Sequence, residues 1–264
     1  MKMKIYNLVA IAIFSCLMIS CVSSRGINFK KQARTSNSSV PLVNEINHQQ
    51  WDDLLKKHVR EEGLVDYKGF QKDSALLSEY LIYLSENVPS EKWSYEEQLA
   101  YFINLYNAST VHLIVKNYPI KSIKDVEATI SPFLKKFIQI GDEKLSLADV
   151  EKGILQKMNE PRIHFAINCA SYSCPKLMRE AYTAKNVDSL MEQATTEFIN
   201  SDKNEITSDR VRISEIFKWY KKDFLKQANS IDEYINQYSV VKIQPTTEIN
   251  YLEYDWRLNE VGVN

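Results

Sequence analysis

The sequence predicts an α+β fold, namely a predominantly helical single domain with a small β-sheet. Three observations support this prediction. Apolar residues recur at helical spacing in the longest segments, while strand-like patterns are few and short. Residues 47–264 contain no linker, repeat or low-complexity run, and a chain of that length buries one core without staples.

The helical segments are expected at residues 47–61, 71–86, 94–117, 146–155, 186–200 and 214–228. Ser94, followed by Glu97, is a capping-box pattern, and Pro119 ends that helix. A hairpin is expected over 137–145 around Gly141-Asp142, a short extended piece over 63–67 and a strand over 163–167.

The N-terminus has the layout of a secretory signal peptide. Lys2 and Lys4 precede an apolar run that ends shortly before Cys21, and this run is too short for a good spanning helix. Residues 17–21 resemble the bacterial lipobox, in which the final Cys is acylated. We therefore expect a signal peptide over 1–20, a lipidated N-terminus and flexible tether over 21–46, and one globular domain over 47–264. The alternative is an ordinary secreted protein with a chance Cys21.

Charge and targeting restrict the partners. Removing residues 1–20 lowers the basic count from 33 to 31 against 34 acidic residues, a net charge of about −3. A weakly acidic protein has no basic surface for nucleic acid, so none is expected as a partner. The expected partners are a membrane, bound through the lipid, and an unidentified peptide, glycan or small molecule. Val22 and Ser23 do not resemble a retention signal for the inner membrane. The expected location is the cell envelope, at the outer membrane and facing the periplasm.

Two cysteines, Cys169 and Cys174, remain in the folded part of the chain. On a regular strand over 163–167, His164 and Asn168 would share one face and Cys169 the other. His164 and Cys169 could therefore meet only if the chain bends after Asn168. Three outcomes are open for the thiols: a reactive thiolate, a structural disulfide, or inert buried side chains.

The residues around Cys174 suggest a second route to a reactive thiol. Ser173, Cys174 and Pro175 predict the start of a helix, with Ser173 as the cap. A helix N-terminus lowers the pKa of a thiol placed there.

The long helix over 94–117 carries polar residues on two faces. A stripe with Glu97, Asn104 and His112 is expected to face solvent, with a cleft as the alternative. Asn107 falls inside the apolar arc, which predicts a buried, hydrogen-bonded amide. It would serve as a structural tie to a neighbouring loop or be presented to a pocket. The C-terminal stretch 251–259, dense in aromatic side chains, is expected to dock as a packed tail, with a site role as the alternative.

Several familiar sites are missing from the sequence. It has no zinc-ligand spacing, no Gly-rich phosphate loop and no nucleophile elbow, and its four His are widely separated. No metal and no cofactor is therefore expected.

Taken together, these stretches resemble the domain of unknown function 547 family, which occurs in bacterial envelope proteins and in plants. The matching residues, in the family's order, are 65–67, YFINLYNA (101–108), SPFL (131–134), SLADVEKGIL (146–155), PRIHFAINCASYSCP (161–175), ISEIFKWYKKDF (213–224) and YDWRLN (254–259). The resemblance implies no assigned function. Lys152 stands where many members carry His, and plant members often lack the thiol matching Cys174, which weighs against a thiol mechanism common to the family.

Two functions compete, and the sequence does not decide whether the protein is an enzyme. The first is a thiol-dependent hydrolase or transferase acting on acyl or amide bonds, with Cys169 or Cys174 as nucleophile and His164 as base. The supporting residues, which orient the base or bind substrate, would be Glu151, Asn104, Asn107, Asn168 and Ser173. The second is a non-catalytic periplasmic module that binds a ligand or protein, and a passive scaffold is the third interpretation.

Overall fold

The computed structural model describes residues 45–127, 129–207 and 210–262. The signal peptide, the lipidation site Cys21 and nearly all of the expected tether lie outside these residues. Ile46, at the end of the expected tether, already packs into the core. Among the described helices, none is both long and apolar enough to span a membrane.

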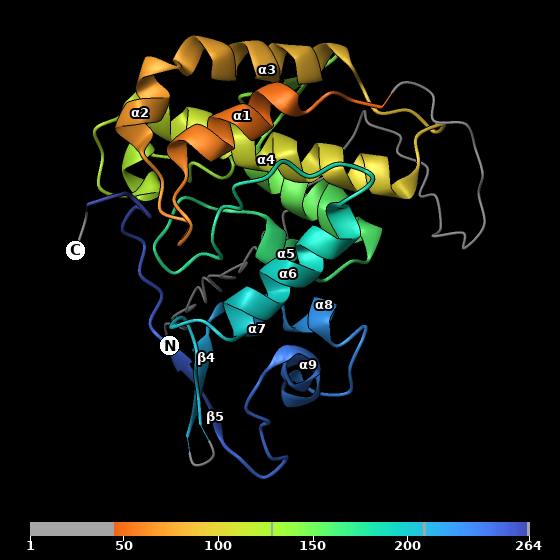
Figure 1. Ribbon diagram of the computed structural model, residues 1–264, viewed down its shortest axis with the longest axis vertical. Coiled ribbons are helices and arrows are strands. Elements are labelled where there is room, and N and C mark those ends of the chain that lie inside the picture. The colour runs from red at the N-terminus through yellow and green to blue at the C-terminus, as the bar shows by residue number, and fades with distance from the viewer. Residues whose placement is uncertain (1–44, 128, 208–209, 263–264) are drawn as a thin grey trace, which may run out of the picture.

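The architecture is mainly helical with two small sheets, which confirms the predicted α+β class. In Figure 1 the first four helices form the upper part of the molecule, α5 and α6 lie below α4, and the larger sheet with α7 to α9 forms the lower part. The α-helices are α1 (Gln49–His58), α2 (Tyr67–Lys72), α3 (Ser74–Glu86), α4 (Tyr95–Asn117), α5 (Ile163–Ala166), α6 (Val187–Ile199), α7 (Ile216–Trp219), α8 (Lys221–Phe224) and α9 (Ile231–Tyr238). Three short elements of other helical types are η1 (Ile123–Val126), η2 (Asp149–Ile154) and η3 (Leu155–Met158).

The strands pair in two separate sheets. The predicted hairpin is confirmed: β1 (Ile138–Ile140) and β2 (Glu143–Leu145) are antiparallel, and Gly141 makes the turn with a φ of 52°. The second sheet has the order β3-β4-β5, with β3 (Glu205–Ile206) antiparallel and β5 (Ile249–Leu252) parallel to β4 (Val211–Ser214). The parallel pair brings the C-terminal segment back alongside residues 211–214.

Helix α4 is the centre of the core. Every residue from Glu97 to Val115 is buried except His112, so the expected solvent-facing stripe is wrong. A helix packed on all sides shows no single apolar face, so the helical periodicity of its apolar residues could not identify a solvent-facing side. The predicted cap is confirmed, because the Ser94 hydroxyl accepts from the Glu97 N–H at 3.0 Å. The Glu97 carboxylate accepts instead from the Ile46 N–H at 2.9 Å.

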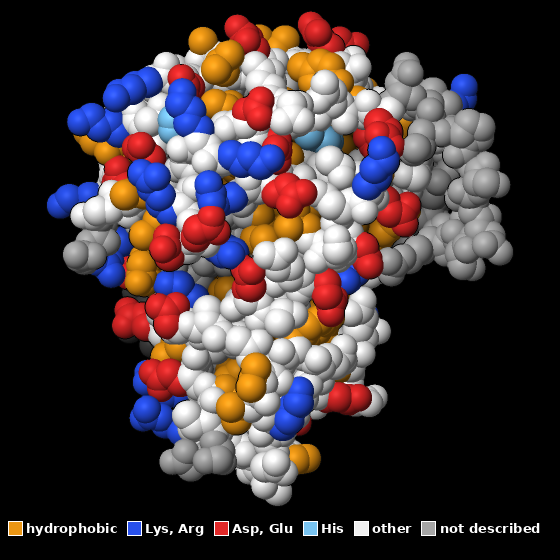
Figure 2. Space-filling model, in the orientation of Figure 1, with side chains coloured by type: hydrophobic (Ala, Val, Ile, Leu, Met, Phe, Trp, Pro, Cys, Tyr) orange, Lys and Arg blue, Asp and Glu red, His pale blue; other side chains and the backbone are white. Residues whose placement is uncertain are grey.

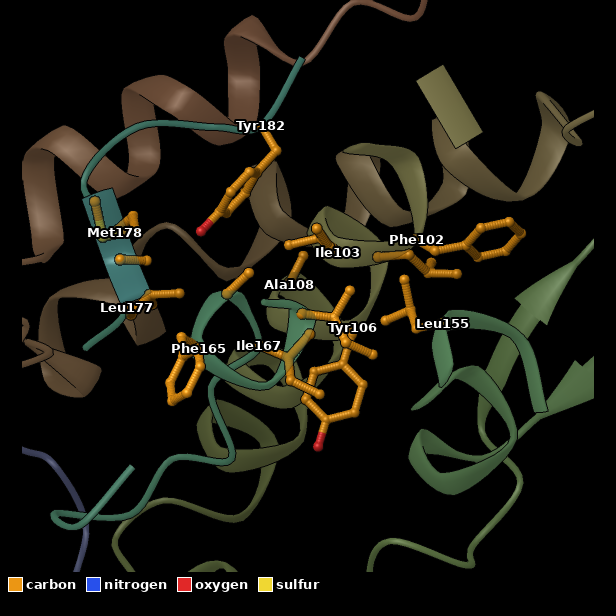
Figure 3. Packing of buried hydrophobic residues seen from close by; sticks show 14 of the residues in the cluster. Phe102, Ile103, Tyr106, Ala108, Leu155, Phe165, Ile167, Leu177, Met178 and Tyr182 are labelled. Atoms are coloured by element: carbon orange, nitrogen blue, oxygen red, sulfur yellow. The ribbon is translucent and has the colours of Figure 1, made fainter. Parts of the chain in front are cut away.

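The expected strand over 163–167 is wrong, because residues 163–166 form the helical turn α5. All four of its residues are buried, and a short apolar run of this kind fits a buried helix as well as a strand. Phe165 packs against Phe198, Phe217 and Phe224 at ring-centroid distances of 5.3–5.8 Å. Figure 3 shows Phe165 and Ile167 within the same core as the α4 side chains.

The expected helix over 214–228 is also partly wrong, since it is divided into the short helices α7 and α8. This division places Trp219 and Tyr220 at the junction of the two helices. Both side chains line the cavity described below.

Candidate functional site

A cavity of about 650 Å³ lies where α4, α5, α7 and the C-terminal segment meet. Its polar side chains include Glu151, Lys152, His164 and both thiols. One side is formed by four aromatic rings, which we call the aromatic wall: Phe133, Trp219, Tyr254 and Trp256. The rings of the last three pack at centroid distances of 4.7–6.1 Å, and Phe133 lies 6.1 Å from Trp256. The cavity is thus mainly apolar, with a small number of polar groups, as ligand pockets usually are.

The two thiols lie together beside this wall. Cys169 and Cys174 are both free, and their Sγ atoms are 2.9 Å apart. The chain does bend after Asn168: Ala170 has a φ of 60°, and the Asn168 side chain accepts the Ala170 N–H at 2.9 Å. The bend turns the Cys169 N–H onto the Cys174 Sγ at 3.0 Å. The bend therefore brings the two free cysteines into contact with each other.

Three polar groups surround the Cys169 sulfur: the Cys174 thiol, the Ser171 Oγ at 3.1 Å and the Tyr254 hydroxyl at 3.2 Å. The single Ser171 hydroxyl proton is donated to the Tyr254 hydroxyl at 2.9 Å, so the Tyr254 hydroxyl and the Cys174 thiol are the side chains left to donate to the sulfur. The contact with Cys174 first, and then those with Ser171 and Tyr254, lowers the pKa of Cys169 to about 7, although burial opposes this shift. Cys169 therefore carries a substantial thiolate fraction at neutral pH.

Cys174 has the opposite character. Burial, together with the neighbouring Cys169 sulfur, raises the pKa of Cys174 well above its usual range, so it remains a thiol. The expected helix start at 173–175 is wrong, because no helix begins there and the next one, α6, starts at Val187. No helix dipole therefore acts on Cys174. The Ser173 hydroxyl instead accepts the Asp255 N–H at 2.8 Å.

His164 has a carboxylate partner in place of a sulfur. Its Nε2 lies 2.9 Å from Asp223 Oδ2, and its ring stacks on Tyr220 at a centroid distance of 3.8 Å. Within the described part of the chain, its Nδ1 is buried and has no hydrogen-bond partner. If the Asp223 carboxylate accepts a hydrogen bond from the Nε2–H, Nδ1 carries the lone pair and can act as a base. His164 lines the same cavity as Cys169 but forms no hydrogen bond to either sulfur among the residues described.

Glu151 and its neighbour Lys152 enter the cavity from the π-helical element η2. The Glu151 carboxylate accepts from the Tyr220 hydroxyl at 2.6 Å, so Tyr220 lies between Glu151 and His164. The Tyr106 side chain from α4 also lines the cavity, and burial, reinforced by Glu151, raises its pKa well above its usual range. Tyr106 therefore keeps its proton and can donate to a ligand. Lys152 is exposed and also lines the cavity.

The candidate substrate-binding amides lie behind the site. Asn107 is buried, as predicted: it donates to the Ala166 carbonyl at 3.0 Å and accepts from the Asn168 N–H at 2.8 Å. Asn168 donates to the Pro175 carbonyl at 2.7 Å, and Asn104 pairs with both backbone groups of Tyr182. These three amides and Ser173 are not among the described residues that line the cavity. The three asparagines tie α4 to the loops that carry the thiols.

Sequence reasoning missed Asp223, Tyr220 and Ser171. Asp223 and Tyr220 come from a helical segment at least 46 residues beyond the thiols (220 − 174), and no spacing pattern connects them to the cavity. Tyr254 lies in the C-terminal stretch for which a packed tail was the favoured interpretation, yet its hydroxyl contacts the candidate nucleophile. The density of aromatic and charged residues in that stretch was the available signal.

The described residues on the face of the domain shown in Figure 2 give no further indication of a partner. Figure 2 shows acidic and basic side chains interspersed over the visible face, without a broad patch of one sign. In the portion of the chain that the structure describes, no group of three or more His, Cys, Asp or Glu side chains is placed to hold a metal ion.

The fold and the cavity together define a mainly helical α+β domain with a pair of free cysteines beside an aromatic wall. The family model described as protein of unknown function, DUF547, matches residues 90–199. The match spans the chain from just before α4 to the end of α6, including His164 and both thiols, and supports the resemblance to that family. Asp223 and Tyr254 lie outside the matched residues. Comparisons with curated proteins and with solved structures found no match.

Proposed function

We propose that the domain is a thiol-dependent hydrolase or transferase acting on acyl bonds, with Cys169 as the nucleophile. The observation that carries this proposal is the set of donors around the Cys169 sulfur at the wall of the cavity. A thiolate, and not a thiol, is the attacking species, and these donors favour it near neutral pH. In this proposal, His164 does not take the thiol proton directly, as the sequence suggested. The nucleophile is activated by hydrogen-bond donors that stabilise the thiolate.

The reaction follows from the groups at the site. The Cys169 thiolate adds to the carbonyl carbon, and the leaving group departs with its bonding electrons and takes a proton from solvent. Water then attacks the resulting thioester while His164 Nδ1 accepts its proton, and the Cys169 thiolate leaves again. Asp223 acts as a positioning residue, because its carboxylate fixes the ring of His164 and the tautomer. In a transferase, a second nucleophile takes the place of water.

The aromatic wall supports an apolar acyl group as substrate. Trp219 is partly exposed at the cavity, and the rings of Phe133 and Trp256 extend the apolar surface beside the thiolate. Among the polar side chains that line the cavity, Glu151 and Lys152 would bind the leaving group or the acceptor.

A burst experiment tests the acyl chemistry. The folded domain should release up to one equivalent of p-nitrophenolate from p-nitrophenyl butyrate and carry the butyryl group on Cys169, as located by mass spectrometry. Cys169→Ser should slow this acylation at least about 100-fold, because an alcohol lacks the ionised state of the thiolate. In Cys174→Ser, which keeps a hydrogen-bond donor beside the sulfur, the adduct should still form on Cys169.

Absence of any adduct on Cys169 with oxygen esters and thioesters, in a domain that is reduced and folded, would contradict the enzyme. A ligand that then binds the cavity unchanged would favour the non-catalytic binding module.

We also propose that the mature protein is anchored in the cell envelope by a lipid on Cys21. Cys21 precedes the described residues, so the support is the lipobox-like run at 17–21. Cys21→Ala should move the protein out of the membrane fraction and abolish metabolic labelling with palmitate, because the other described thiols lie inside the domain. Ser24→Thr, a small substitution outside the run at 17–21, serves as the matched control. Continued palmitate labelling of Cys21→Ala would overturn the anchor.

A further inference from the structure

The second thiol is not used by the acyl chemistry beyond its hydrogen bond to Cys169. Cys174 is 7% exposed, and it lines both the main cavity and a smaller one of about 360 Å³. The side chains of Tyr172, Lys176 and Phe198 line that smaller cavity. Cys174 therefore lies in the wall between the two cavities, and Cys169 lines the main one.

The geometry of the pair suits a sulfur–sulfur bond. The two Sγ atoms are 2.9 Å apart, and a bond of about 2.05 Å requires a movement of only about 1 Å in total. The connecting loop is already closed by the Cys174 N–H, which donates to the Ser171 carbonyl at 3.1 Å. The loop thus already holds the two sulfurs in contact.

We propose that Cys169 and Cys174 form a reversible redox couple, in which Cys169 is the sulfur attacked by an oxidant and Cys174 is the resolving thiol. The proposal rests on Cys169 as the nucleophile of the proposed function, but not on an acyl substrate. With hydrogen peroxide as oxidant, the Cys169 thiolate attacks one oxygen, the S–O bond forms as the O–O bond breaks, and the sulfur becomes a sulfenic acid. The other oxygen is displaced as hydroxide and takes a proton from solvent to become water. Cys174 then attacks the sulfenic sulfur, the S–S bond forms, and a second water leaves. Two equivalents of an external thiol restore the dithiol.

The two cysteines have the asymmetry that this sequence of steps requires. The pKa of Cys169 is lowered to about 7 by its contact with Cys174 and then by the nearby hydroxyls, whereas burial raises the pKa of Cys174. The first is thus ionised for attack, and the second keeps its proton until it resolves the sulfenic acid. Because oxidation consumes the acyl nucleophile, the couple would turn the acyl chemistry off in oxidising conditions and on after reduction.

The test compares the domain with two serine variants under one equivalent of hydrogen peroxide, in the presence of dimedone. The wild-type domain should become lighter by two hydrogens, with little dimedone adduct, and dithiothreitol should reverse the change. Cys174→Ser should accumulate the dimedone adduct on Cys169, because no thiol is left to resolve the sulfenic acid. Cys169→Ser should give neither product. Circular dichroism of each variant verifies folding, and Cys174→Ala provides a second variant if the serine variant does not fold.

The couple is overturned if wild type and Cys174→Ser give equal dimedone adducts on Cys169, or if wild type is unchanged by peroxide. The outcome is separable from the acyl test. If the domain forms the disulfide but Cys169 is never acylated, the proposed function is wrong and the redox couple stands. If Cys169 is acylated but cannot be oxidised, the redox couple is wrong and the proposed function stands.

Discussion

Iodoacetamide should alkylate Cys169 of the reduced, folded domain with a half-maximal rate near pH 7 and should leave Cys174 unlabelled until the chain unfolds. The alkylation rate should rise with pH because the lowered pKa of Cys169 sets where the thiolate forms. The thiolate is lost as the pH falls through about 7, and ionisation is nearly complete two pH units above that value. A free thiol at about 8.5 is ionised to well under 1% at pH 6, whereas Cys169 would be ionised to roughly a tenth.

The rate advantage is smaller than the gain in ionisation. A thiolate loses nucleophilicity as its pKa falls, with a Brønsted coefficient of about 0.4–0.5. At pH 6 the thiolate fraction of Cys169 is roughly thirtyfold larger than that of a free thiol, but each thiolate reacts about fivefold more slowly. Labelling of Cys169 at pH 6 should thus be several times faster than that of an unperturbed cysteine in a short peptide. Mass spectrometry of peptides from the pulse-labelled domain gives both rates at once.

Tyr254→Phe provides the sharper test, because it removes one O–H donor and little volume. A hydrogen bond to a charged group contributes about 1.5–3 kcal/mol, so the alkylation midpoint should rise by about one pH unit or more. Tyr172→Phe is the matched control, since Tyr172 is partly exposed and contacts Lys203 and Arg257. A midpoint above pH 8 in the wild type, or one unmoved by Tyr254→Phe, would contradict the donor cluster.

Asn107→Ala should lower the free energy of unfolding by about 1–3 kcal/mol, because two buried backbone groups lose their partner. The amide donates to the Ala166 carbonyl and accepts from the Asn168 N–H, so both contacts join α4 to the segment that carries the thiols. Urea unfolding, followed by far-ultraviolet circular dichroism, measures the change.

Asn117→Ala is the control for this measurement. Asn117 ends the same helix at an exposed position, and its amide bonds only to the Leu113 carbonyl four residues earlier. Its replacement should stay within about 0.5 kcal/mol, as surface substitutions usually do. A cost for Asn107→Ala no larger than that of the control would show that this tie contributes no stability.

The local elements that the sequence predicted correctly are those with strong local signals. The Ser94 cap is satisfied within three residues, and the hairpin turn at Gly141 needs a left-handed φ that glycine adopts readily. Asn107 was placed correctly because an amide in an apolar arc must find a partner. Residues 163–167 were misassigned because an apolar run of five residues fits both a strand and a buried helix turn, and packing decides between them.

The candidate site shows the same division. From the sequence alone, the thiols, His164 and the bend after Asn168 could be named, because their residue types and the small residues that follow Cys169 are visible in one segment. Which groups contact which depends on chain closure over long separations. Tyr254 reaches Cys169 through the parallel pairing of β4 and β5, and Asp223 reaches His164 through the division between α7 and α8. Local propensities carry no information on such contacts, so the tertiary structure alone decided that the Cys169 sulfur contacts Cys174 and Tyr254 while His164 pairs with a carboxylate.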